Sequence, residues 1–386
     1  MKKTADVVIV GGGVMGASLA WHLASRGCRD VLVLERLPEL GGGSTGKATG
    51  GFRCQFSTEV SVRLSLLSRE KLLRFPEEVG VDSGYLPYGY LFLAGDAEQL
   101  AALDWLHGFL HGLGAPCERV GPEDIRRLNP AANLEGIPGG TFGPADGFIR
   151  PLAILSGYTE AARRLRVEFE YGAEVLGLTV EADRIVGIET SRGPVSAGTV
   201  VDAAGAWAGP VARMAGVDIP VVPAKRQVAQ TQPFGGLPDT MPMTIFLEDG
   251  FHLRVRDGRV LLLRSEDFAT ADPFDTTFDR DWLDRVVARS HERVPCLREA
   301  EIDVAGSWAG LYEMSPDSHA LLGPAPGVAN LFLMNGSSGH GVMHSPALGH
   351  LLAEMILDGE ARTVDVRALR PTRFAEGEPV AGLSLL

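Results

Sequence analysis

Residues 6–16 read DVVIVGGGVMG, in which a run of strand-forming apolar residues breaks into the pattern G-x-G-x-x-G. A helix-like stretch follows at residues 17–25, and a second apolar strand at residues 30–34 leads to Glu35. This order of strand, glycine turn, helix, strand and acid is typical of a βαβ unit that binds a dinucleotide. We therefore expect a Rossmann-like α/β fold around this segment, rather than an ordinary glycine-rich turn between a strand and a helix.

Each glycine of the motif has its own expected role. Gly11 permits the tight turn, Gly13 lets the backbone approach a pyrophosphate, and Gly16 lets the helix pack close to the strand. The phosphates are expected at the amino terminus of the helix, beside Val14 and Met15, where unpaired N–H groups favour negative charge. The motif alone leaves NAD and FAD as alternatives.

Two further segments complete the expected binding site for the dinucleotide. Glu35 is expected to accept hydrogen bonds from a ribose, and Arg36 follows it directly. The loop at residues 40–51 contains GGGSTG, and this density of glycine is typical of backbone that lies close to a ligand. The candidates for cofactor contact in this loop are Ser44, Thr45, Thr49 and Gly50.

The composition is that of an ordinary globular protein of two or three domains, with 386 residues, 45% hydrophobic and 22% charged. The formal net charge of −13 disfavours nucleic acid and anionic membranes as partners. The four cysteines are scattered, so we expect reduced packing residues and no metal site. No apolar run reaches the roughly 18 residues of a membrane span, and no signal peptide precedes the first strand, so a cytoplasmic location is expected.

A second strand–turn–helix pattern lies near the carboxyl end of the chain. Residues 331–335 read LFLMN, the turn GSSGHG follows at 336–341, and a helix is predicted at residues 347–357. Another buried strand is predicted at residues 199–204 and ends in Gly205. Both strands are expected to join the first one in a single α/β layer.

Strand-like segments fill most of the chain between these patterns. Residues 167–196 are predicted to form a β-meander, residues 139–149 a connector, and residues 227–263 an antiparallel sheet, followed by a helix at 282–289. On a predicted helix at residues 97–113, apolar side chains repeat at helical spacing and are expected to face the core. They are Trp105, Phe109 and Leu113.

The simplest arrangement is a discontinuous Rossmann-like FAD-binding domain with an inserted α+β substrate domain built on an antiparallel sheet. Dinucleotide-type strands at both ends of the chain and alternating strands between them support this division. The cofactor domain is predicted to comprise residues 1–84, 150–222 and 320–386, and the substrate domain residues 85–149 and 223–319.

Together these segments resemble the FAD-dependent amine oxidases of the D-amino-acid oxidase superfamily, especially the sarcosine oxidase-like branch. The resemblance spans essentially the whole chain. Besides the first glycine motif it rests on VVDAAG at 200–205, SPD at 315–317 before LLG at 321–323, and SGHG at 338–341. It favours FAD over NAD, because an NAD dehydrogenase has no evident need for the second glycine turn.

The resemblance implies that the helix after SGHG points its amino terminus at the pyrimidine edge of the flavin. Unpaired N–H groups there stabilise negative charge on the reduced ring, and His340 adds a hydrogen bond or a positive charge. The alternative for His340 is a loop histidine that bonds to the backbone. The cofactor candidates of this half are Gly205, Trp207, Gly336, Gly339, His340, Gly341, Val342 and Met343.

Arg53 is the expected substrate-binding residue. In sarcosine oxidase-like proteins an arginine shortly after the glycine-rich loop binds the substrate carboxylate, and GGFRCQF at 50–56 places Arg53 at that position. A planar guanidinium can hold a carboxylate by two parallel hydrogen bonds. The alternative is a surface arginine paired with Glu59 or Glu70.

Several positions depart from the family pattern. Tyr312 stands where D-amino-acid oxidases carry a carboxylate-binding arginine, which argues against a primary-amine substrate. Met343 replaces a lysine of the sarcosine oxidases, and His344 is a candidate for the second carboxylate ligand. Gly310 or Leu311 falls where those enzymes carry a cysteine that binds FAD covalently, so non-covalent FAD is expected.

The resemblance implies oxidation of a secondary amino acid, such as sarcosine or another N-alkyl glycine, by hydride transfer from Cα to FAD. Reoxidation by O2 would give H2O2, and Tyr312 and His344 are candidates for orienting the amine. The string SGHGVMHSP at 338–346 also resembles catalytic subunits of proline dehydrogenases and multimeric sarcosine oxidases. A proline dehydrogenase, another electron acceptor, and a flavin subunit that needs partner chains therefore stay open as alternatives, as does the oligomeric state.

Overall fold

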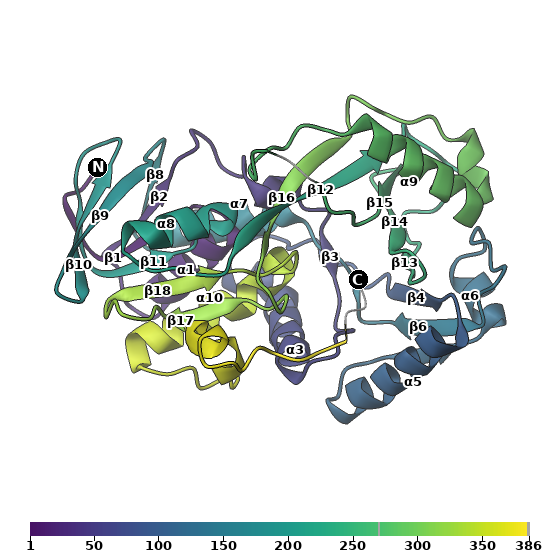
Figure 1. Ribbon diagram of the computed structural model, residues 1–386, viewed down its shortest axis with the longest axis horizontal. Coiled ribbons are helices and arrows are strands. Elements are labelled where there is room, and N and C mark those ends of the chain that lie inside the picture. Colours follow the sequence, from purple (N-terminus) through teal and green to yellow (C-terminus); the bar gives the residue numbers. More distant parts are fainter. Residues whose placement is uncertain (269–270, 384–386) are drawn as a thin grey trace.

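The computed structural model describes residues 1–268 and 271–383, in which two large sheets lie side by side along the long axis of the molecule (Figure 1). Strands within residues 4–35, 168–202 and 321–335 build the sheet on the left of the figure, and strands within residues 90–143 and 222–314 build the sheet on the right. A small antiparallel pair, β3 (Gly51–Phe52) and β7 (Gly147–Phe148), lies between them.

The six-stranded sheet has the order β17-β18-β11-β1-β2-β8, and all neighbours are parallel except β17 and β18. Its strands are β1 (Thr4–Val10), β2 (Val31–Glu35), β8 (Glu168–Tyr171), β11 (Ser196–Asp202), β17 (Leu321–Pro324) and β18 (Leu331–Asn335). The central strand β1 buries Val7 and Ile9 in one apolar cluster, and Val8 and Val10 in another. A strand that is apolar on both faces is expected in a parallel sheet covered on both sides.

The first cluster contains α1 (Val14–Ser25), α10 (Gly341–Asp358), α3 (Glu59–Leu73) and α7 (Pro151–Arg164). The contact between α1 and α10 is close, because a Cβ on Gly349 would overlap Ser18 Oγ. Ser18 Oγ also donates a hydrogen bond to the carbonyl oxygen of Ser345 at 2.7 Å. The second cluster contains α8 (Ala208–Met214) with the antiparallel pair β9 (Val175–Glu181) and β10 (Arg184–Thr190), so the sheet is the middle of three layers.

The eight-stranded sheet has the order β16-β12-β15-β14-β13-β4-β6-β5 and is antiparallel except between β13 and β4. Its strands are β4 (Tyr90–Ala94), β5 (Glu118–Val120), β6 (Gly139–Gly143), β12 (Val222–Gln230), β13 (Met243–Phe246), β14 (Phe251–Arg256), β15 (Arg259–Leu263) and β16 (Trp308–Met314). The helices α5 (Ala97–Gly112), α6 (Pro122–Leu128) and α9 (Arg280–Arg293) pack against it. The structure also has two one-turn α-helices, α2 (Ser44–Lys47) and α4 (Phe75–Glu78), and short 3-10 helices.

The predicted fold class is confirmed by this arrangement and by the comparisons given below. The division into domains at residues 84, 149, 222 and 319 stays a prediction, and residues 269–270 and 384–386 of those ranges lie outside the described residues. Among residues 1–268 and 271–383, no helix is both long and apolar enough to cross a membrane.

Two predicted strand arrangements are wrong. Residues 168–171 do not open a meander, because β8 pairs in parallel with β2 in the six-stranded sheet. Residues 139–149 are not a plain connector, because they contain β6 and β7. The glycines of β6 serve close backbone approach, since a Cβ on Gly140 would overlap the carbonyl oxygen of Phe92 in β4.

The predicted core face of α5 is correct only in part. Phe109 and Leu113 are partly buried and pack against the first cluster, whereas Trp105 is 50% exposed and stacks on Phe109 at 5.1 Å. The fully buried residues of this helix are Leu103, Leu106 and Leu110. Both stripes have helical spacing, and the packing against the sheet selects the aliphatic one. The last helix, α10, begins at Gly341 rather than at Ala347, because Pro346 lies inside the helix instead of before it.

Candidate active site

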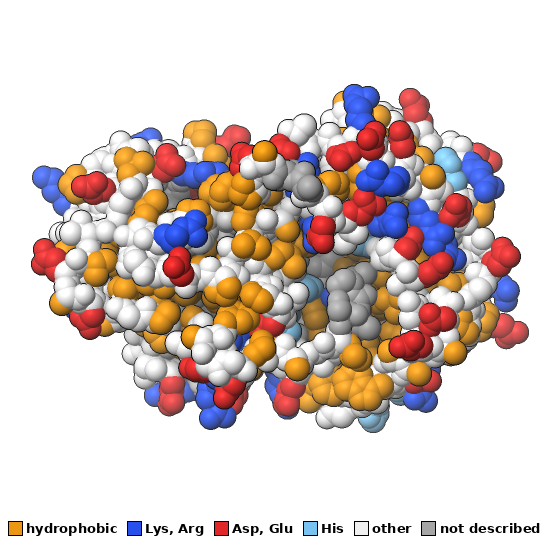
Figure 2. All heavy atoms as spheres, viewed as in Figure 1, with side chains coloured by type: hydrophobic (Ala, Val, Ile, Leu, Met, Phe, Trp, Pro, Cys, Tyr) orange, Lys and Arg blue, Asp and Glu red, His pale blue; other side chains and the backbone are white. Residues whose placement is uncertain are grey.

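A cavity of about 490 Å³ lies between the two sheets, where Figure 2 shows a hollow in the surface. It runs from the glycine turn before α1 to β12, β16 and the start of α10. Nearly all predicted site residues line it. Those that do not are Gly16, Gly336 and His344.

The end of the cavity at α1 is shaped to receive a pyrophosphate. Gly13 is the N-cap of α1, so the N–H groups of the first turn have no acceptor within the helix, and that of Val14 donates to Thr45 Oγ1 at 3.2 Å. A Cβ on Gly13 would come no closer to other residues than 3.5 Å, to Thr45 Oγ1, and one on Gly43 would meet nothing within 4 Å. Open space beside exposed helix N–H groups fits a negatively charged phosphate.

Gly11 and Gly16 hold α1 against β1. Gly11 has φ = +110°, and a Cβ there would overlap the carbonyl oxygen of Ala203 just after β11. A Cβ on Gly16 would overlap the carbonyl oxygen of Gly11 and lie 3.2 Å from Ile9 Cγ2. Gly16 therefore acts through packing, which explains why it does not line the cavity.

Replacing Gly11 with alanine is expected to lower stability by about 2–5 kcal/mol, from left-handed backbone strain and backbone overlap together, and to lower the flavin content of the purified protein. Gly27→Ala is the matched control, because Gly27 has φ = +99° but open space around its Cβ position. We expect the control to cost only about 1–2 kcal/mol and to keep the flavin. Thermal unfolding and the ratio of visible to ultraviolet absorbance measure both effects, and equal loss in the two variants would contradict the role given to Gly11.

Glu35 lies at the end of β2 and lines the cavity. Its Oε2 accepts the N–H of Gly12 at 2.9 Å, and its Oε1 accepts the N–H of Leu37 at 2.8 Å. A carboxylate has about four acceptor positions, so these two bonds leave room for a ribose hydroxyl.

Arg36, the residue after Glu35, packs against a pair of stacked aromatic rings. The Arg36 guanidinium lies 3.7 Å from the centre of the Trp207 ring, and Phe274 stacks on Trp207 at 5.3 Å with nearly parallel rings. Arg36 and Trp207 both line the cavity. The structure thus brings together two predicted cofactor residues that are far apart in the sequence.

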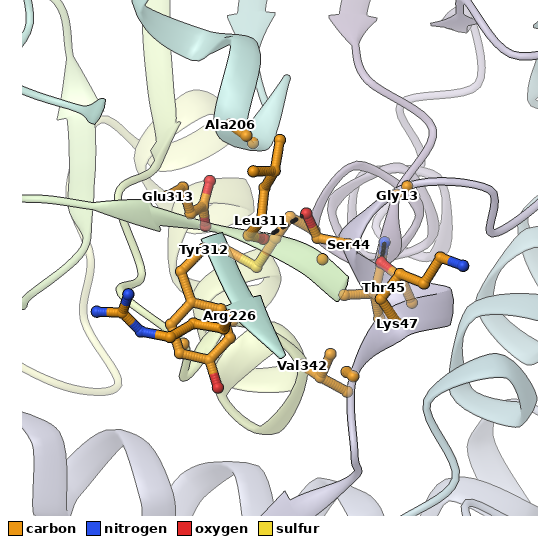
Figure 3. Close-up of a pocket in the computed structure, with 18 of the residues that line it drawn as sticks. Gly13, Ser44, Thr45, Lys47, Ala206, Arg226, Leu311, Tyr312, Glu313 and Val342 are labelled. Atoms are coloured by element: carbon orange, nitrogen blue, oxygen red, sulfur yellow. Dashed lines mark hydrogen bonds between the residues drawn. The ribbon is translucent and has the colours of Figure 1, made fainter. Parts of the chain in front are cut away.

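The glycine-rich loop is tied to the eight-stranded sheet by hydrogen bonds. Ser44 Oγ donates to the carbonyl oxygen of Leu311 on β16 at 2.8 Å, which is the dashed line in Figure 3. Arg254 Nη1 donates to the carbonyl oxygens of Thr49 at 2.7 Å and Gly50 at 3.1 Å. The loop is therefore fixed along the middle of the cavity, with Gly13, Ser44 and Thr45 at one end in Figure 3 and Tyr312 and Arg226 at the other.

The turn before α10 closes the far end of the cavity. A Cβ on Gly339, which has φ = +91°, would overlap the Tyr312 ring. Glu313 Oε1 accepts the N–H of Ser337 at 3.1 Å, while its Oε2 is buried without a hydrogen-bond partner among the described residues. Burial raises the pKa of Glu313 to about 7, so a large share of this carboxyl is protonated at neutral pH.

Arg53 is buried, with 7% of its surface exposed, and lines the cavity. Its Nη1 donates to the carbonyl oxygen of Gln55 at 2.8 Å, and its guanidinium lies 4.2 Å from the centre of the Phe56 ring. No carboxylate within residues 1–268 and 271–383 forms an ion pair with it, and burial lowers its pKa. The alternative of a surface arginine paired with Glu59 or Glu70 is wrong, because those residues pair with other arginines.

His340 touches Arg53. Its Nε2 lies 3.2 Å from Arg53 Nη2, and its ring packs edge-on against Phe56. Burial, and secondarily the charge of Arg53, lower the pKa of His340 well below its usual value. Of the two predicted contributions, a hydrogen bond and a positive charge, the neutral imidazole can supply the hydrogen bond.

His344 is not brought to the cavity. Its Nε2 lies 2.9 Å from Ser65 Oγ on α3, and burial lowers its pKa to about 3. His344 was predicted as a candidate for the second carboxylate ligand. This prediction is not supported, because His344 lies on the buried face of α10 and does not line the cavity. Gly336 also lies off the cavity, where a Cβ would come within 2.8 Å of Leu321. Met343, which stands in the place of the family's lysine, is buried and lines the cavity.

Residues 6–355, most of the chain, match the family described as DAO, FAD dependent oxidoreductase. The chain belongs to this family. The predicted recognition and the predicted cofactor, FAD, are thereby confirmed for this oxidoreductase, and the cradle around Gly13 and Gly43 fits the phosphates of that cofactor.

The oxidoreductase is similar to several individual proteins. It is 32% identical to the mitochondrial dimethylglycine dehydrogenase of Rattus norvegicus over 97% of this chain, but spans about half, 45%, of that relative's length. It is 30% identical to the FAD-dependent oxidoreductase domain-containing protein 1 of Xenopus laevis over 98% of this chain and 84% of the relative. Among solved structures it is similar to the L-proline dehydrogenase of P. horikoshii, with TM-score 0.92, 29% identity and coverage of 98% and 100%.

Among the lining residues of the oxidoreductase that sequence reasoning missed, four polar ones stand out at the far end of the cavity. They are Tyr90, Arg226, His252 and Glu313. The first three lie on the strands β4, β12 and β14, where a polar side chain at an otherwise apolar position was the available signal. Burial lowers the pKa of His252 to about 4, so its imidazole is neutral near pH 7.

The non-covalent attachment predicted for FAD has a direct test. No cysteine is among the described residues that line the cavity. Gly310 and Leu311, one of which stands where the sarcosine oxidases carry the cysteine that binds FAD, both line its wall. We expect purified protein to be yellow and to release all its flavin on acid precipitation. Flavin fluorescence that stays with the polypeptide on a denaturing gel would contradict this.

Proposed function

We propose that the protein oxidises a secondary amino acid, such as sarcosine or another N-alkyl glycine, with FAD as the hydride acceptor. The observation that carries this proposal is the buried Arg53 guanidinium, which faces the cavity and has no carboxylate partner among the described residues. A substrate carboxylate would supply that partner through two parallel hydrogen bonds.

FAD, when bound, supplies the hydride acceptor, and the residues of this chain bind and orient the substrate. Arg53 would fix the carboxylate, and with it the position of the Cα–H bond. The Tyr312 ring packs on Gly339 and lies 5.7 Å from Arg226, so it forms the wall opposite the turn. Tyr312 is 37% exposed as a residue, but desolvation of its phenol group raises the pKa. Its hydroxyl therefore stays protonated and can hydrogen-bond the amine.

The charge of the site favours a neutral amine. Arg53 supplies positive charge, whereas His340 and His252 are neutral because burial lowers the pKa of both. A second positive charge on the substrate nitrogen would be repelled by Arg53, and hydride departure from Cα requires the nitrogen lone pair. No general base on the protein is needed if the substrate binds as the neutral amine.

A substrate panel tests the proposal. Holoenzyme is mixed anaerobically with sarcosine, N,N-dimethylglycine, L-proline and glycine, and bleaching of the flavin absorbance is followed. We expect rapid bleaching by at least one N-substituted amino acid and little by glycine. Failure of all N-substituted amino acids, or a preference for glycine, would sink the proposal.

A dehydrogenase that passes electrons to an acceptor other than O2 is the second candidate. It is favoured by the names of the relatives, which include a dimethylglycine dehydrogenase and an L-proline dehydrogenase. Comparing H2O2 formation with reduction of an artificial dye separates the oxidase from the dehydrogenase. Size-exclusion chromatography tests whether the chain needs partner subunits.

The cytoplasmic location expected from the sequence is also part of our proposal. Cell fractionation tests it.

A further inference from the structure

Asp146 is a buried carboxyl group that the proposed reaction does not use. It lies in the tight turn between β6 and β7 and is fully buried. Its Oδ1 accepts the N–H of Cys54 at 2.6 Å, and its Oδ2 accepts a hydrogen bond from Gln55 Nε2 at 2.9 Å. Asp146 therefore binds the two residues that follow Arg53 in the chain.

Gln55 links Asp146 to the guanidinium. Its carbonyl oxygen accepts the hydrogen bond from Arg53 Nη1, while its side-chain amide bonds to Asp146, to Thr141 Oγ1 at 2.8 Å and to the carbonyl oxygen of Tyr90 at 3.1 Å. The whole network is buried, so the charges of Arg53 and Asp146 interact through protein rather than through water.

We propose that Asp146 is a positioning residue that couples the binding of a carboxylate at Arg53 to the uptake of one proton. The inference rests on the proposed function, because it takes Arg53 as the carboxylate site. Hydrogen bonds from Gln55 and Cys54, and after them the charge of Arg53, favour the ionised form of Asp146. A bound carboxylate adds a negative charge beside Arg53 and offsets the contribution of that charge. The Asp146 carboxylate then takes a proton from solvent and becomes a neutral carboxylic acid, with no other bond made or broken.

The titration range of Asp146 fits this coupling. Burial raises its pKa to about 7, against hydrogen bonds and the charge of Arg53 that lower it. The other titratable groups that interact with it keep one charge state near neutral pH, because burial raises the pKa values of the thiols and phenols and Arg53 stays cationic. They are Arg53, Cys54, Tyr85, Tyr90 and Cys117.

Calorimetric titration of the FAD-loaded protein with acetate tests the coupling without turnover. Because acetate binds better when Asp146 is protonated, its Kd is expected to rise by about tenfold between about pH 6.5 and pH 8.5. The binding heats of acetate, measured in two buffers of different ionisation enthalpy, should differ by the amount expected for uptake of a proton by the protein. Acetamide, which is neutral, should show neither the pH dependence nor the proton uptake.

Three variants assign the result. Arg53→Met should abolish acetate binding, and binding that survives this change contradicts the proposed function rather than the coupling. Asp146→Asn, which keeps an acceptor for the Cys54 N–H, should bind acetate with a flat pH profile and no proton uptake. Uptake that persists in this variant and disappears in His340→Gln would overturn the proposal. If the asparagine variant does not fold, absence of proton uptake by the wild-type protein overturns it alone.

Discussion

Replacing Arg53 with methionine is expected to lower kcat/KM for the amino acid substrate by about 30- to 1,000-fold, mostly through a higher KM. This range corresponds to about 2–4 kcal/mol, the typical loss when one partner of a buried, hydrogen-bonded charge pair is removed. The side chain is buried and packs on Phe56 and Phe92, and methionine keeps part of this apolar contact. Steady-state kinetics with the substrate found in the panel measure the effect.

Two further variants separate binding geometry from charge. Arg53→Lys keeps the charge but cannot form two parallel hydrogen bonds, so we expect an intermediate KM. Arg63→Met is the control, because Arg63 is exposed on α3 and pairs with Glu59. An Arg53→Met protein with unchanged KM would remove Arg53 from the substrate site.

Replacing Arg373 with methionine is expected to lower the free energy of unfolding by about 3–5 kcal/mol, as for other broken buried ion pairs. Arg373 is fully buried, and its Nε and Nη2 each donate to a different carboxylate oxygen of Asp317 at 2.8 Å. Asp317 Oδ2 also accepts the N–H of Val380 at 2.9 Å. Removing the arginine leaves a buried carboxylate without its cation, and denaturant unfolding of the holoenzyme measures the cost.

The same ion pair predicts a dependence of stability on pH. Burial raises the pKa of Asp317, but hydrogen bonds from Arg373 and from backbone N–H groups outweigh it, so the pKa lies below its usual value. The free energy that the ionised Asp317 contributes to folding is therefore fully present above its pKa in the unfolded chain, about 3.9. This contribution is lost as the pH falls through the lower pKa of Asp317 in the folded protein. Arg367→Met, which breaks an exposed pair with Asp365, is the control and should leave the unfolding midpoint nearly unchanged. An equal loss of unfolding free energy in Arg373→Met and Arg367→Met would contradict the role given to the buried ion pair.

The parts of the fold predicted correctly are those encoded locally. The glycine turn after β1, the strand that ends at Glu35 and the start of α5 at Ala97 each depend on neighbouring residues, and each lies where the pattern indicates. The pairing of β8 with β2 could not be predicted, because a four-residue strand carries no information about its partner. The exposure of Trp105 on α5 could not be predicted for a similar reason, since two apolar stripes on this helix compete and only the sheet decides which one is fully buried.

The candidate site divides in the same way. Gly13, Thr45 and His340 lie in loops whose composition marks them, and the cavity contains all three. Arg226 and His252 come from strands whose inward face depends on sheet register, which the sequence does not specify without the partner strands. His344 shows the converse error, because its nearness to His340 in the sequence suggests a shared site, while one turn of α10 carries it to Ser65.

The close crossing of α1 and α10 has a consequence for synthesis of the protein. The α1 surface around Ser18 is completed by Ser345 and Gly349, which leave the ribosome more than three hundred residues later. A nascent chain therefore carries the glycine turn before α1 without the helix that closes the far end of the cavity. Contacts of such long sequence separation form slowly, so capture of FAD is expected as a late event, after translation has passed α10.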